Sequence, residues 1–357
     1  MKKIVVKASR DYEILIENGI LRQAGPLIRK VAKGNRAVIV TDDVVEPLYL
    51  EPVKMSMEEA GFSVDVFTME NGEKSKDITH YAALLEFLAE RTITRSDMLV
   101  ALGGGVVGDL TGFAAATYLR GVDFVQIPTT LLAAVDSSVG GKTAIDLKAG
   151  KNLAGCFYQP SLVLCDCETL RTLPPEVFAD GMAEVIKYGA IADKELWEDL
   201  KQPVWPQIDE IVSRCVTIKK EIVQKDEYDL GVRQYLNFGH TIGHSIEKNS
   251  QYEIGHGRAV AMGMVLAVKI SEDQGECDRG CLEEMTQMLE RYHLPVWTDY
   301  TPEQLCKPMK SDKKRNGDTI SFIMLRCIGE CFAKKMKIQE LENAVEETMG
   351  EAYGSSH

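Results

Sequence analysis

Three of the six histidines of this chain, His240, His244 and His256, lie close together in the sequence. His240 and His244 are four residues apart, so a helix would present both imidazoles on one face. A neutral imidazole is the commonest metal ligand, and this spacing lets one helix offer two of them to one ion. Gly239 and Gly243 precede these two histidines and would let a metal or an anion approach the backbone. The cluster predicts a metal or anion site, and unrelated core or surface histidines are the alternative.

A catalytic zinc site has three protein ligands and an open position, so a further ligand is expected from elsewhere in the chain. Glu184 is the best candidate because it lies on the apolar side of the helical segment ADGMAEVIKYG. Lys187 is three residues on and shares that face, although the two residues would also suit a surface ion pair. Lys219, Arg233 and Asn237 lead into the histidine cluster. A guanidinium and an amide beside two imidazoles suit a carboxylate or phosphate next to a metal.

A second group of charged residues lies in the glycine- and serine-rich segment TTLLAAVDSSVGGKTAIDLKAGKNLAG. Asp136 has apolar neighbours, Lys142 follows a Gly-Gly pair, and Lys151 and Asn152 follow a further glycine. Buried charges need partners, so this spread of an acid and two lysines predicts a phosphate or polyol site. A loop with solvated lysines is the alternative.

A glycine-rich turn, Gly103–Asp109, follows the apolar run Met98–Leu102 and contains a literal G-x-G-x-x-G. A strand before and a helix after would place a pyrophosphate at the helix N-terminus. In an ordinary Rossmann unit the acidic residue follows the glycines by about 20 residues, but here Asp42 precedes them. The polar loop Asn71–Lys76 would lie at the same edge of the sheet. We therefore predict a dinucleotide site in which the acidic residue precedes the glycines. The alternatives are a turn that binds no ligand and an Asp42 that only caps a helix.

Strand-like and helix-like segments alternate in the first half of the chain, which predicts a Rossmann-like α/β domain with a mostly parallel sheet. The strand-like runs are Ile4–Val6, Tyr12–Ile16, Ala37–Val40, Ser63–Phe67, Met98–Leu102, Phe124–Ile127 and Leu162–Leu164. The helix-like segments are Val45–Ala60, Asp77–Arg91 and Gly108–Tyr118.

The pattern changes at Leu173-Pro174-Pro175, after which amphipathic helical stretches dominate and only Thr319–Leu325 resembles a strand. These stretches are Val177–Ile191, Pro206–Lys225, Leu236–Lys248, Ala259–Asp273 and Leu282–Tyr292. We predict a nucleotide-binding α/β domain over residues 1–177 and an α-helical metal- and substrate-binding domain over residues 178–357.

The composition limits the classes of protein that the chain can belong to. It has 357 residues, and its apolar fraction of 45 % is ordinary for a globular protein. Its formal net charge of −13 argues against a basic nucleic-acid-binding surface, whereas a local cluster of Lys and Arg can still bind an anionic substrate. No run approaches the roughly 20 apolar residues of a membrane span, and MKKIVVKASRDYEIL does not resemble a signal peptide. The nine cysteines are scattered without a C-x-x-C pair. We expect a cytoplasmic protein with reduced thiols and with neither nucleic acid nor membrane as a partner.

The chain closely resembles the 3-dehydroquinate synthase family of sugar phosphate cyclases from about Ala8 to Gly329. The motifs that carry the resemblance occur in the family's order: GGGVVGD, YLRGVDFVQIPTTLLAAVDSSVGGKTAID, GKNLAG, TLPPE, GMAEVIKYG and NFGHTIGHSIE with HG-x-AV. The resemblance implies a dehydroquinate synthase-like fold, with NAD⁺ on the α/β domain and Zn²⁺ or Co²⁺ on the helical domain. It implies Glu184, His240 and His256 as the metal ligands, and it moves His244 to the substrate site.

The resemblance also implies roles for residues outside the metal site. The catalytic and substrate-contacting set is Asp136, Lys142, Lys187, Lys219, Arg233, Asn237 and His244, with Asn152 and Lys314 on the substrate. Lys314 lies in the basic segment Asp312-Lys313-Lys314, which resembles a phosphate clamp of the family. Either Lys313 or Lys314 would reach the phosphate. Arg120 matches an arginine that reaches the neighbouring subunit's phosphate site, which implies a homodimer. The cofactor-binding set is Asp42, Asn71, Gly72, Glu73, Lys74, Ser75, Lys76, Gly105, Val106, Val107, Gly108, Asp109, Thr129, Thr130, Lys142, Lys151, Thr169, Leu170, Arg171 and Thr172.

The implied reaction converts 3-deoxy-D-arabino-heptulosonate 7-phosphate to 3-dehydroquinate and phosphate, the second step of the shikimate pathway of aromatic amino acid biosynthesis. Three alternatives are weighed against it: a cyclase that forms an inosose or valiolone, a metal-dependent polyol dehydrogenase, and a non-enzymatic metal-binding protein. The last two would not need the phosphate-binding set. The sequence departs from the family's common residues at Val44, Asp229 and Arg258, none of which is an implied metal ligand.

Overall fold

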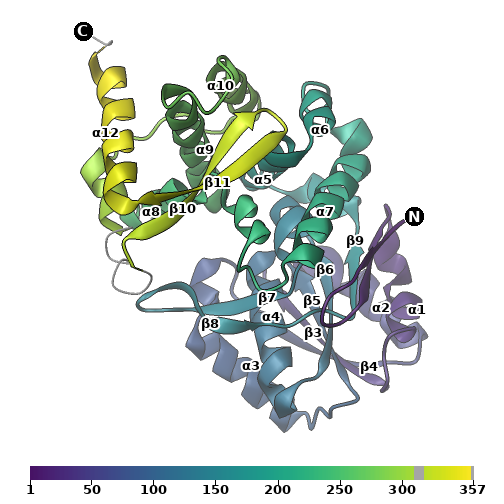
Figure 1. Cartoon of the computed structure of the whole chain (residues 1–357). Coiled ribbons are helices and arrows are strands. Elements are labelled where there is room, and N and C mark those ends of the chain that lie inside the picture. Colours follow the sequence, from purple (N-terminus) through teal and green to yellow (C-terminus); the bar gives the residue numbers. More distant parts are fainter. Residues whose placement is uncertain (309–316, 355–357) are drawn as a thin grey trace. The chain divides into compact units, whose positions relative to one another are not determined.

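The computed structural model describes residues 1–308 and 317–354 (Figure 1). The chain forms two compact units. Unit 1 comprises Met1–Pro174 and Ile208–Tyr228, and unit 2 comprises Pro175–Gln207 and Asp229–His357. The helix within Ile208–Tyr228 therefore packs with unit 1, whereas the sequence pattern grouped it with the helices of the second half. The functional domains predicted over residues 1–177 and 178–357 stay a prediction.

A seven-stranded sheet forms the framework of unit 1 (Figure 1). Its strands are β1 (Lys2–Val6), β2 (Tyr12–Ile16), β3 (Arg36–Asp42), β4 (Ser63–Met69), β5 (Met98–Gly103), β6 (Asp123–Pro128) and β9 (Leu162–Cys165). They are arranged in the order β1-β2-β9-β6-β5-β3-β4, and only the β1–β2 pair is antiparallel. The mostly parallel sheet predicted from the sequence is confirmed.

Alternating side chains of the central strands divide between two hydrophobic cores on opposite faces of this sheet. On β3, Ala37 and Ile39 belong to one core, whereas Val38 and Val40 belong to the other. Helices α1 (Ala24–Arg29) and α2 (Glu51–Glu59) cover the first face, and α3 (Ile78–Glu90) and α4 (Gly105–Thr117) cover the second. A short π-helix, η2 (Glu46–Leu50), leads into α2. Burial on both faces explains why these strands are nearly continuous apolar runs.

The order of strands creates a switch point beside β3. The chain leaves β3 for β4 on one side and leaves β5 for β6 on the other, while β3 and β5 are neighbours. In open parallel sheets, ligands bind outside the carboxyl ends of the strands at such a point. Asp42 ends β3 and Gly103 ends β5, so both lie at this edge.

Two further elements of unit 1 differ from the sequence-based expectation. The glycine-rich lysine segment is not an irregular loop but an antiparallel hairpin of β7 (Lys142–Leu147) and β8 (Gly150–Phe157). It follows a π-helical turn, η5 (Ala133–Ser137). Helix α7 (Ile208–Lys225) joins unit 1 by packing against η5 and β1, and Lys2 Nζ contacts its Glu210 carboxylate at 2.6 Å.

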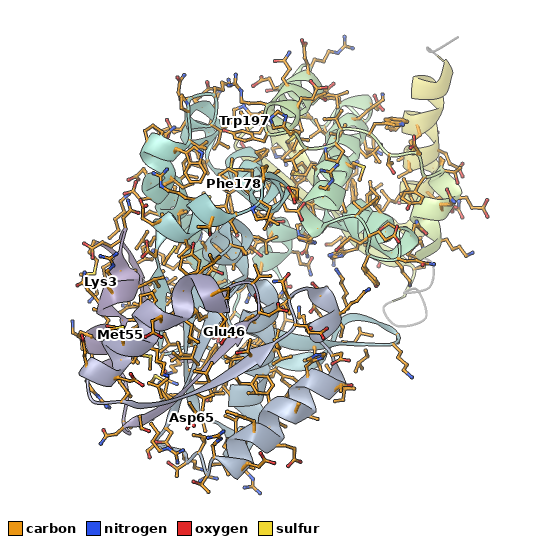
Figure 2. All side chains as sticks on the ribbon, turned by 180° about the vertical axis from the view of Figure 1, so that it is seen from behind. Lys3, Glu46, Met55, Asp65, Phe178 and Trp197 are labelled. Atoms are coloured by element: carbon orange, nitrogen blue, oxygen red, sulfur yellow. The ribbon has the colours of Figure 1, made fainter. Side chains whose placement is uncertain are left out.

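Unit 2 is mainly helical. Its helices include α5 (Pro175–Ala192), α6 (Lys194–Asp199), α8 (His240–Asn249), α9 (His256–Asp273), α10 (Cys281–Arg291) and α12 (Ile338–Gly354). Strands β10 (Thr319–Cys327) and β11 (Glu330–Lys337) form an antiparallel hairpin, of which the sequence pattern predicted only the first strand. Trp197 of α6 is fully buried (Figure 2). Within residues 1–308 and 317–354, no helix combines the length and the apolar character that crossing a membrane requires.

Candidate active site

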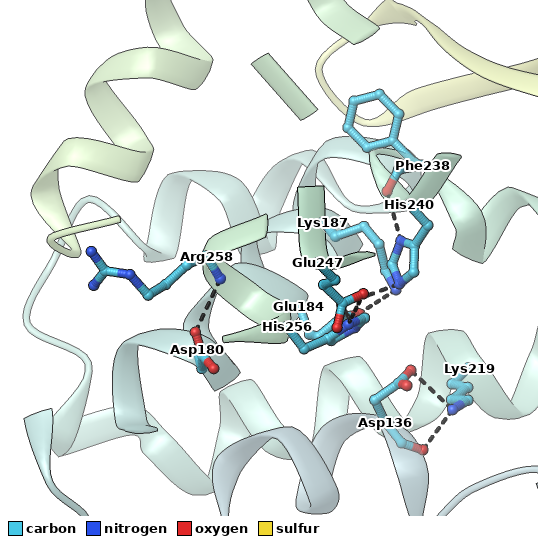
Figure 3. Close-up of polar contacts among 10 residues, drawn as sticks. All are labelled: Asp136, Asp180, Glu184, Lys187, Lys219, Phe238, His240, Glu247, His256 and Arg258. Carbon is cyan, nitrogen blue, oxygen red and sulfur yellow. Dashed lines mark hydrogen bonds and ion pairs between the residues drawn. The ribbon is translucent and has the colours of Figure 1, made fainter. Parts of the chain in front are cut away.

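Three donor groups of unit 2 converge at the start of two helices (Figure 3). His240 is the first residue of α8, His256 is the first of α9, and Glu184 lies within α5. Glu184 Oε1 is 3.5 Å from His240 Nε2 and 3.4 Å from His256 Nε2. Two ligands about 2.0–2.1 Å from a tetrahedral zinc ion lie about 3.4 Å from each other. The spacing and the donor types therefore fit a zinc or cobalt ion held by these three residues.

Hydrogen bonding fixes which nitrogen of His240 faces the cluster. Its Nδ1 is 3.0 Å from the Phe238 carbonyl oxygen. Because a carbonyl only accepts, Nδ1 carries the proton and Nε2 keeps its lone pair for a ligand. Burial, reinforced by the Lys187 cation, lowers the pKa of His240 to about 3. The imidazole is therefore neutral near pH 7, as a metal ligand must be.

His256 lies between two carboxylates. Glu184 faces its Nε2, and Glu247 Oε2 lies 3.5 Å from its Nδ1. Burial lowers the pKa of His256, but its interactions with Glu184 and Glu247 outweigh burial and raise this pKa to about 10. Without a metal, the two carboxylates thus stabilise a proton on His256, and their negative charge would equally favour a divalent cation in place of the Nε2 proton.

Glycines allow the helices that carry the ligands to approach closely. Gly239 precedes α8 with φ of 77°, and a Cβ there would lie 2.5 Å from Met264 Cγ of α9. A Cβ on Gly257 would lie 2.1 Å from the Asp180 carbonyl oxygen of α5. The Asp180 carboxylate also accepts a hydrogen bond of 3.0 Å from the Arg258 backbone N–H, which holds the start of α9 against α5. These contacts place His256 beside Glu184.

The remaining predicted residues of unit 2 lie near this cluster in the sequence but differ in exposure. Lys187 is buried and pairs with Glu184 Oε2. Arg233 is 2 % exposed on η8 (Val232–Asn237), which ends at Asn237. His244 is exposed, and it groups with Glu247 and His256, not with Glu184. Within the described residues, His240 and His244 fall in different candidate ligand groups, and the i,i+4 pair expected from spacing alone stays a prediction.

Apart from Lys142 and Lys151, the predicted cofactor-binding residues of unit 1 lie at or after the carboxyl ends of five parallel strands. Asp42 ends β3, and the other segments, 71–76, 105–109, 129–130 and 169–172, come after β4, β5, β6 and β9. Parallel strands bring these ends to one edge of the sheet. Helix α4 begins at Gly105, so its free N–H groups lie at this edge, where they suit a phosphate.

Two residues at this edge have identifiable structural roles. Asp42 Oδ1 accepts hydrogen bonds from the backbone N–H groups of Val44 and Val45 at 3.0 and 2.9 Å. The carboxylate therefore caps the turn after β3 and not the helix that follows, whose N-cap is Val45 without a side-chain hydrogen bond, and its role at the cofactor stays a prediction. In η6 (Cys167–Thr172), the Tyr49 hydroxyl donates to the Thr169 carbonyl oxygen at 3.1 Å.

The sheet edge that carries the predicted cofactor-binding segments is called the nucleotide edge below. A buried ion pair connects it to the β7–β8 hairpin. Lys76 Nζ is 2.6 Å from Asp109 Oδ2 and donates to Asn152 Oδ1 at 2.6 Å. Burial lowers the pKa of Lys76, but the carboxylates of Asp109 and Glu73 outweigh it and raise this pKa, so the lysine is charged. Asn152 has φ of 55°, and its backbone N–H donates to Asp146 Oδ1 at 2.8 Å. One lysine thus fixes both the start of α4 and the tip of the hairpin.

The other predicted residues of unit 1 include one tight pair and several exposed cations. Lys219 Nζ of α7 contacts Asp136 of η5 through the carbonyl oxygen at 2.5 Å and the carboxylate at 2.9 Å. Lys142 begins β7 with an exposed side chain, and Arg120 is exposed with φ of 64°. Lys151 of β8 is half-buried. Lys314 lies outside the described residues.

Two acidic residues at the metal centre, Asp180 and Glu247, were not identified from the sequence. Asp180 holds α9, and Glu247 contacts His256. Glu247 lies seven residues after His240, so helical spacing already placed it on the histidine-bearing face. Asp180 precedes Glu184 by four residues and shares its face for the same reason.

Comparison with known proteins agrees with the fold and the site. The family models for the N-terminal and C-terminal parts of 3-dehydroquinate synthase match residues 66–180 and 181–315. A 3-dehydroquinate synthase of Enterococcus faecalis is 44 % identical over 348 residues, covering 96 % of this chain and 97 % of the relative.

Two solved structures share the fold over nearly their whole length. A 2-epi-5-epi-valiolone synthase of Streptomyces hygroscopicus with NAD⁺ and Zn²⁺ bound has a TM-score of 0.87 and 25 % identity, covering 98 % of this chain and 99 % of its own. A 2-deoxy-scyllo-inosose synthase complexed with carbaglucose-6-phosphate, NAD⁺ and Co²⁺ has a TM-score of 0.87 and 24 % identity, covering 97 % and 100 %.

The parallel sheet with its glycine turn and the helical unit with its histidine–carboxylate cluster define a sugar phosphate cyclase fold. Within this class, the chain belongs to the 3-dehydroquinate synthase family. It is an enzyme of the shikimate pathway, a lyase that eliminates phosphate and forms 3-dehydroquinate.

Proposed function

We propose that this chain converts 3-deoxy-D-arabino-heptulosonate 7-phosphate to 3-dehydroquinate and phosphate with one bound NAD⁺ and one divalent metal ion, Zn²⁺ or Co²⁺. The observation that carries the proposal is the cluster of Glu184, His240 and His256, whose donor atoms all lie within 4.8 Å of one another. When bound, the metal would polarise a substrate hydroxyl and NAD⁺ would take a hydride from that carbon and later return it.

The residues of unit 2 would hold the substrate and set its charge. Arg233 is a buried guanidinium and would bind the substrate carboxylate through two parallel hydrogen bonds. Lys187 would hold Glu184 in its orientation, because the two side chains form a buried pair. Asn237 and His244 would hydrogen-bond substrate oxygens. This division of tasks places most of the catalysis in positioning and electrostatics.

The residues of unit 1 would bind the cofactor and the phosphate. The free N–H groups at the start of α4 would receive the pyrophosphate, with the loop Asn71–Lys76 beside them. Lys142 and Asn152 of the hairpin would contact the substrate, together with the pair of Asp136 and Lys219. Lys151, like Lys142, would also contact the cofactor.

We further propose a homodimer in which Arg120 reaches the phosphate site of the neighbouring subunit. Its guanidinium is exposed and its backbone is held with φ of 64°, as suits a group presented outward from a tight turn. Lys314 completes the proposed phosphate-binding set.

Product analysis tests the function directly. The heptulosonate phosphate and NAD⁺ are supplied to purified protein, and phosphate, 3-dehydroquinate and NADH are measured over time. We expect equal amounts of phosphate and 3-dehydroquinate with no net NADH, because the hydride is returned. Net NADH would instead indicate a polyol dehydrogenase, and turnover of a sugar phosphate without a carboxylate would indicate a cyclase of the inosose or valiolone type.

A further inference from the structure

We propose that Glu247 is a positioning residue for the metal site, which holds His256 in the orientation and tautomer that a metal requires. The inference rests on the proposed metal binding and extends it to a residue outside the three ligands. Glu247 lies on α8, which also carries His240, and its carboxylate reaches the first residue of α9 (Figure 3). One helix would therefore supply one ligand and support a second.

The two carboxylates that contact His256 lie at different nitrogens of its ring. Glu184 Oε1 lies 3.4 Å from Nε2, and Glu247 Oε2 lies 3.5 Å from Nδ1, on the other side of the ring. Glu247 is 2 % exposed, so its buried carboxylate needs a hydrogen-bond donor or a positive charge as a partner. The N–H at Nδ1 of His256 supplies one.

The chemistry assigns the direction of this contact. An ionised carboxylate can only accept hydrogen bonds, so it keeps the proton of a neutral imidazole on Nδ1. The lone pair then lies on Nε2, toward Glu184. His240 is arranged in the same way, but its partner is the neutral carbonyl of Phe238. An anionic partner raises the basicity of the imidazole, so His256 should bind a metal more strongly with Glu247 than without it.

The test measures metal affinity and needs no turnover. Zn²⁺ affinity is determined by competition with a chromophoric chelator, and Co²⁺ binding is followed by visible absorption. We expect Glu247→Gln to bind Zn²⁺ about 10- to 100-fold more weakly than wild type, the usual effect of losing such a partner. Glu184→Ala serves as the ligand-loss reference, and Glu253→Gln changes an exposed carboxylate of the α8–α9 connection as the matched control.

The outcomes separate this inference from the proposed function. Unchanged affinity in Glu247→Gln overturns the inference alone. Loss as complete as in Glu184→Ala, with the Co²⁺ spectrum of one fewer ligand, also overturns it, because Glu247 would then be a ligand in the His244–Glu247–His256 group. A wild type that binds neither metal refutes the proposed metal site itself. If Glu247→Gln fails to fold, Glu247→Asp takes its place, and its retracted carboxylate should weaken binding in the same direction.

Discussion

The nucleotide edge of unit 1 and the metal centre of unit 2 are built in different ways. At the nucleotide edge, five segments follow strands in the order of the chain, and a parallel sheet brings their ends together. At the metal centre, Glu184, His240 and His256 come from three helices that meet through glycine contacts. The first arrangement follows from strand order, whereas the second depends on tertiary packing. Disturbing each kind of site should therefore have a different outcome.

The largest effect is expected at the metal centre, from Glu184→Ala. Loss of a Lewis acid removes several kcal/mol of transition-state stabilisation, which corresponds to a fall of about 10³-fold or more in kcat. The variant should lose its metal together with its activity, which elemental analysis and steady-state phosphate release would measure. Treatment of the wild type with a chelator should reproduce the loss, and added Zn²⁺ or Co²⁺ should reverse it. Full activity in a verified metal-free sample would refute the prediction.

The next effect concerns Arg233, a buried cation of unit 2. Lys at this position keeps the charge but cannot imitate the two parallel hydrogen bonds of a guanidinium. A charge-assisted hydrogen bond of roughly 1.5–3 kcal/mol corresponds to a fall of about 10- to 150-fold in kcat/KM for Arg233→Lys. Steady-state phosphate release measures the change, and thermal melting with metal analysis serves as the control for folding and ligation. An unchanged kcat/KM would show that Arg233 does not bind the carboxylate and would favour a substrate without one.

The two regions also differ in how far the sequence predicts them. Strand β2 occupies the predicted Tyr12–Ile16, and the other strands of the large sheet differ from their predicted bounds only at the ends, because apolar runs between turn signals define a buried parallel strand. The β7–β8 hairpin was missed because its glycines and lysines lack an alternating pattern. Helix α7 was predicted, but its amphipathic pattern cannot say which core it covers.

The metal centre shows the same limit more sharply. Spacing along one helix pairs His240 with His244, yet the ring of His256 is the one that faces Glu184. His256 begins a different helix, and the intervening turn determines where it lies, so no periodicity relates it to His240. Only the family resemblance indicated the set of Glu184, His240 and His256, which the structure brings together as a candidate ligand group. Glu247 was missed because a carboxylate at the end of an amphipathic helix resembles a solvated one until its burial is known.

A charge cluster of unit 1, formed by Asp123 with Arg10 and Lys33, provides a contrasting, purely structural prediction. Asp123 of β6 accepts a hydrogen bond from Arg10 Nη1 at 2.6 Å and contacts Lys33 Nζ at 2.9 Å. Burial raises the pKa of Asp123, but the hydrogen bonds to Arg10 and Lys33 outweigh burial and lower it. Because both partners are partly solvated, we expect Asp123→Asn to reduce the free energy of unfolding by only about 1 kcal/mol.

The pH dependence of the stability that Asp123 contributes has a definite sign. A carboxyl whose folded pKa is lowered stabilises the fold above its unfolded pKa of about 3.9, and it loses this contribution as the pH falls through the folded pKa. Urea unfolding should therefore separate wild type from Asp123→Asn at pH 7, and the difference should shrink below about pH 4. Equal stabilities at pH 7, or a difference that grows on acidification, would contradict the assignment. Phosphate release should be unchanged.

The smallest effect is expected for Arg258→Glu, a change at one of the three positions where the sequence departs from the family resemblance. Two opposing interactions of similar size act there. A carboxylate in the first turn of α9 gains about 0.3–1 kcal/mol from the helix dipole. It also loses the attraction between Arg258 and the Asp180 carboxylate, which already accepts the Arg258 backbone N–H, and replaces that attraction with repulsion. Because the Arg258 side chain is exposed, the net change in the free energy of unfolding should stay within about 0.5 kcal/mol.

Zn²⁺ affinity should also be unchanged in Arg258→Glu, since the backbone contact that positions His256 does not depend on this side chain. Urea unfolding and chelator competition measure the two quantities on the same protein. A loss of metal affinity without a loss of stability would contradict this prediction and would mean that the Arg258 side chain contributes to the charge balance of the centre, in addition to the backbone contact with Asp180.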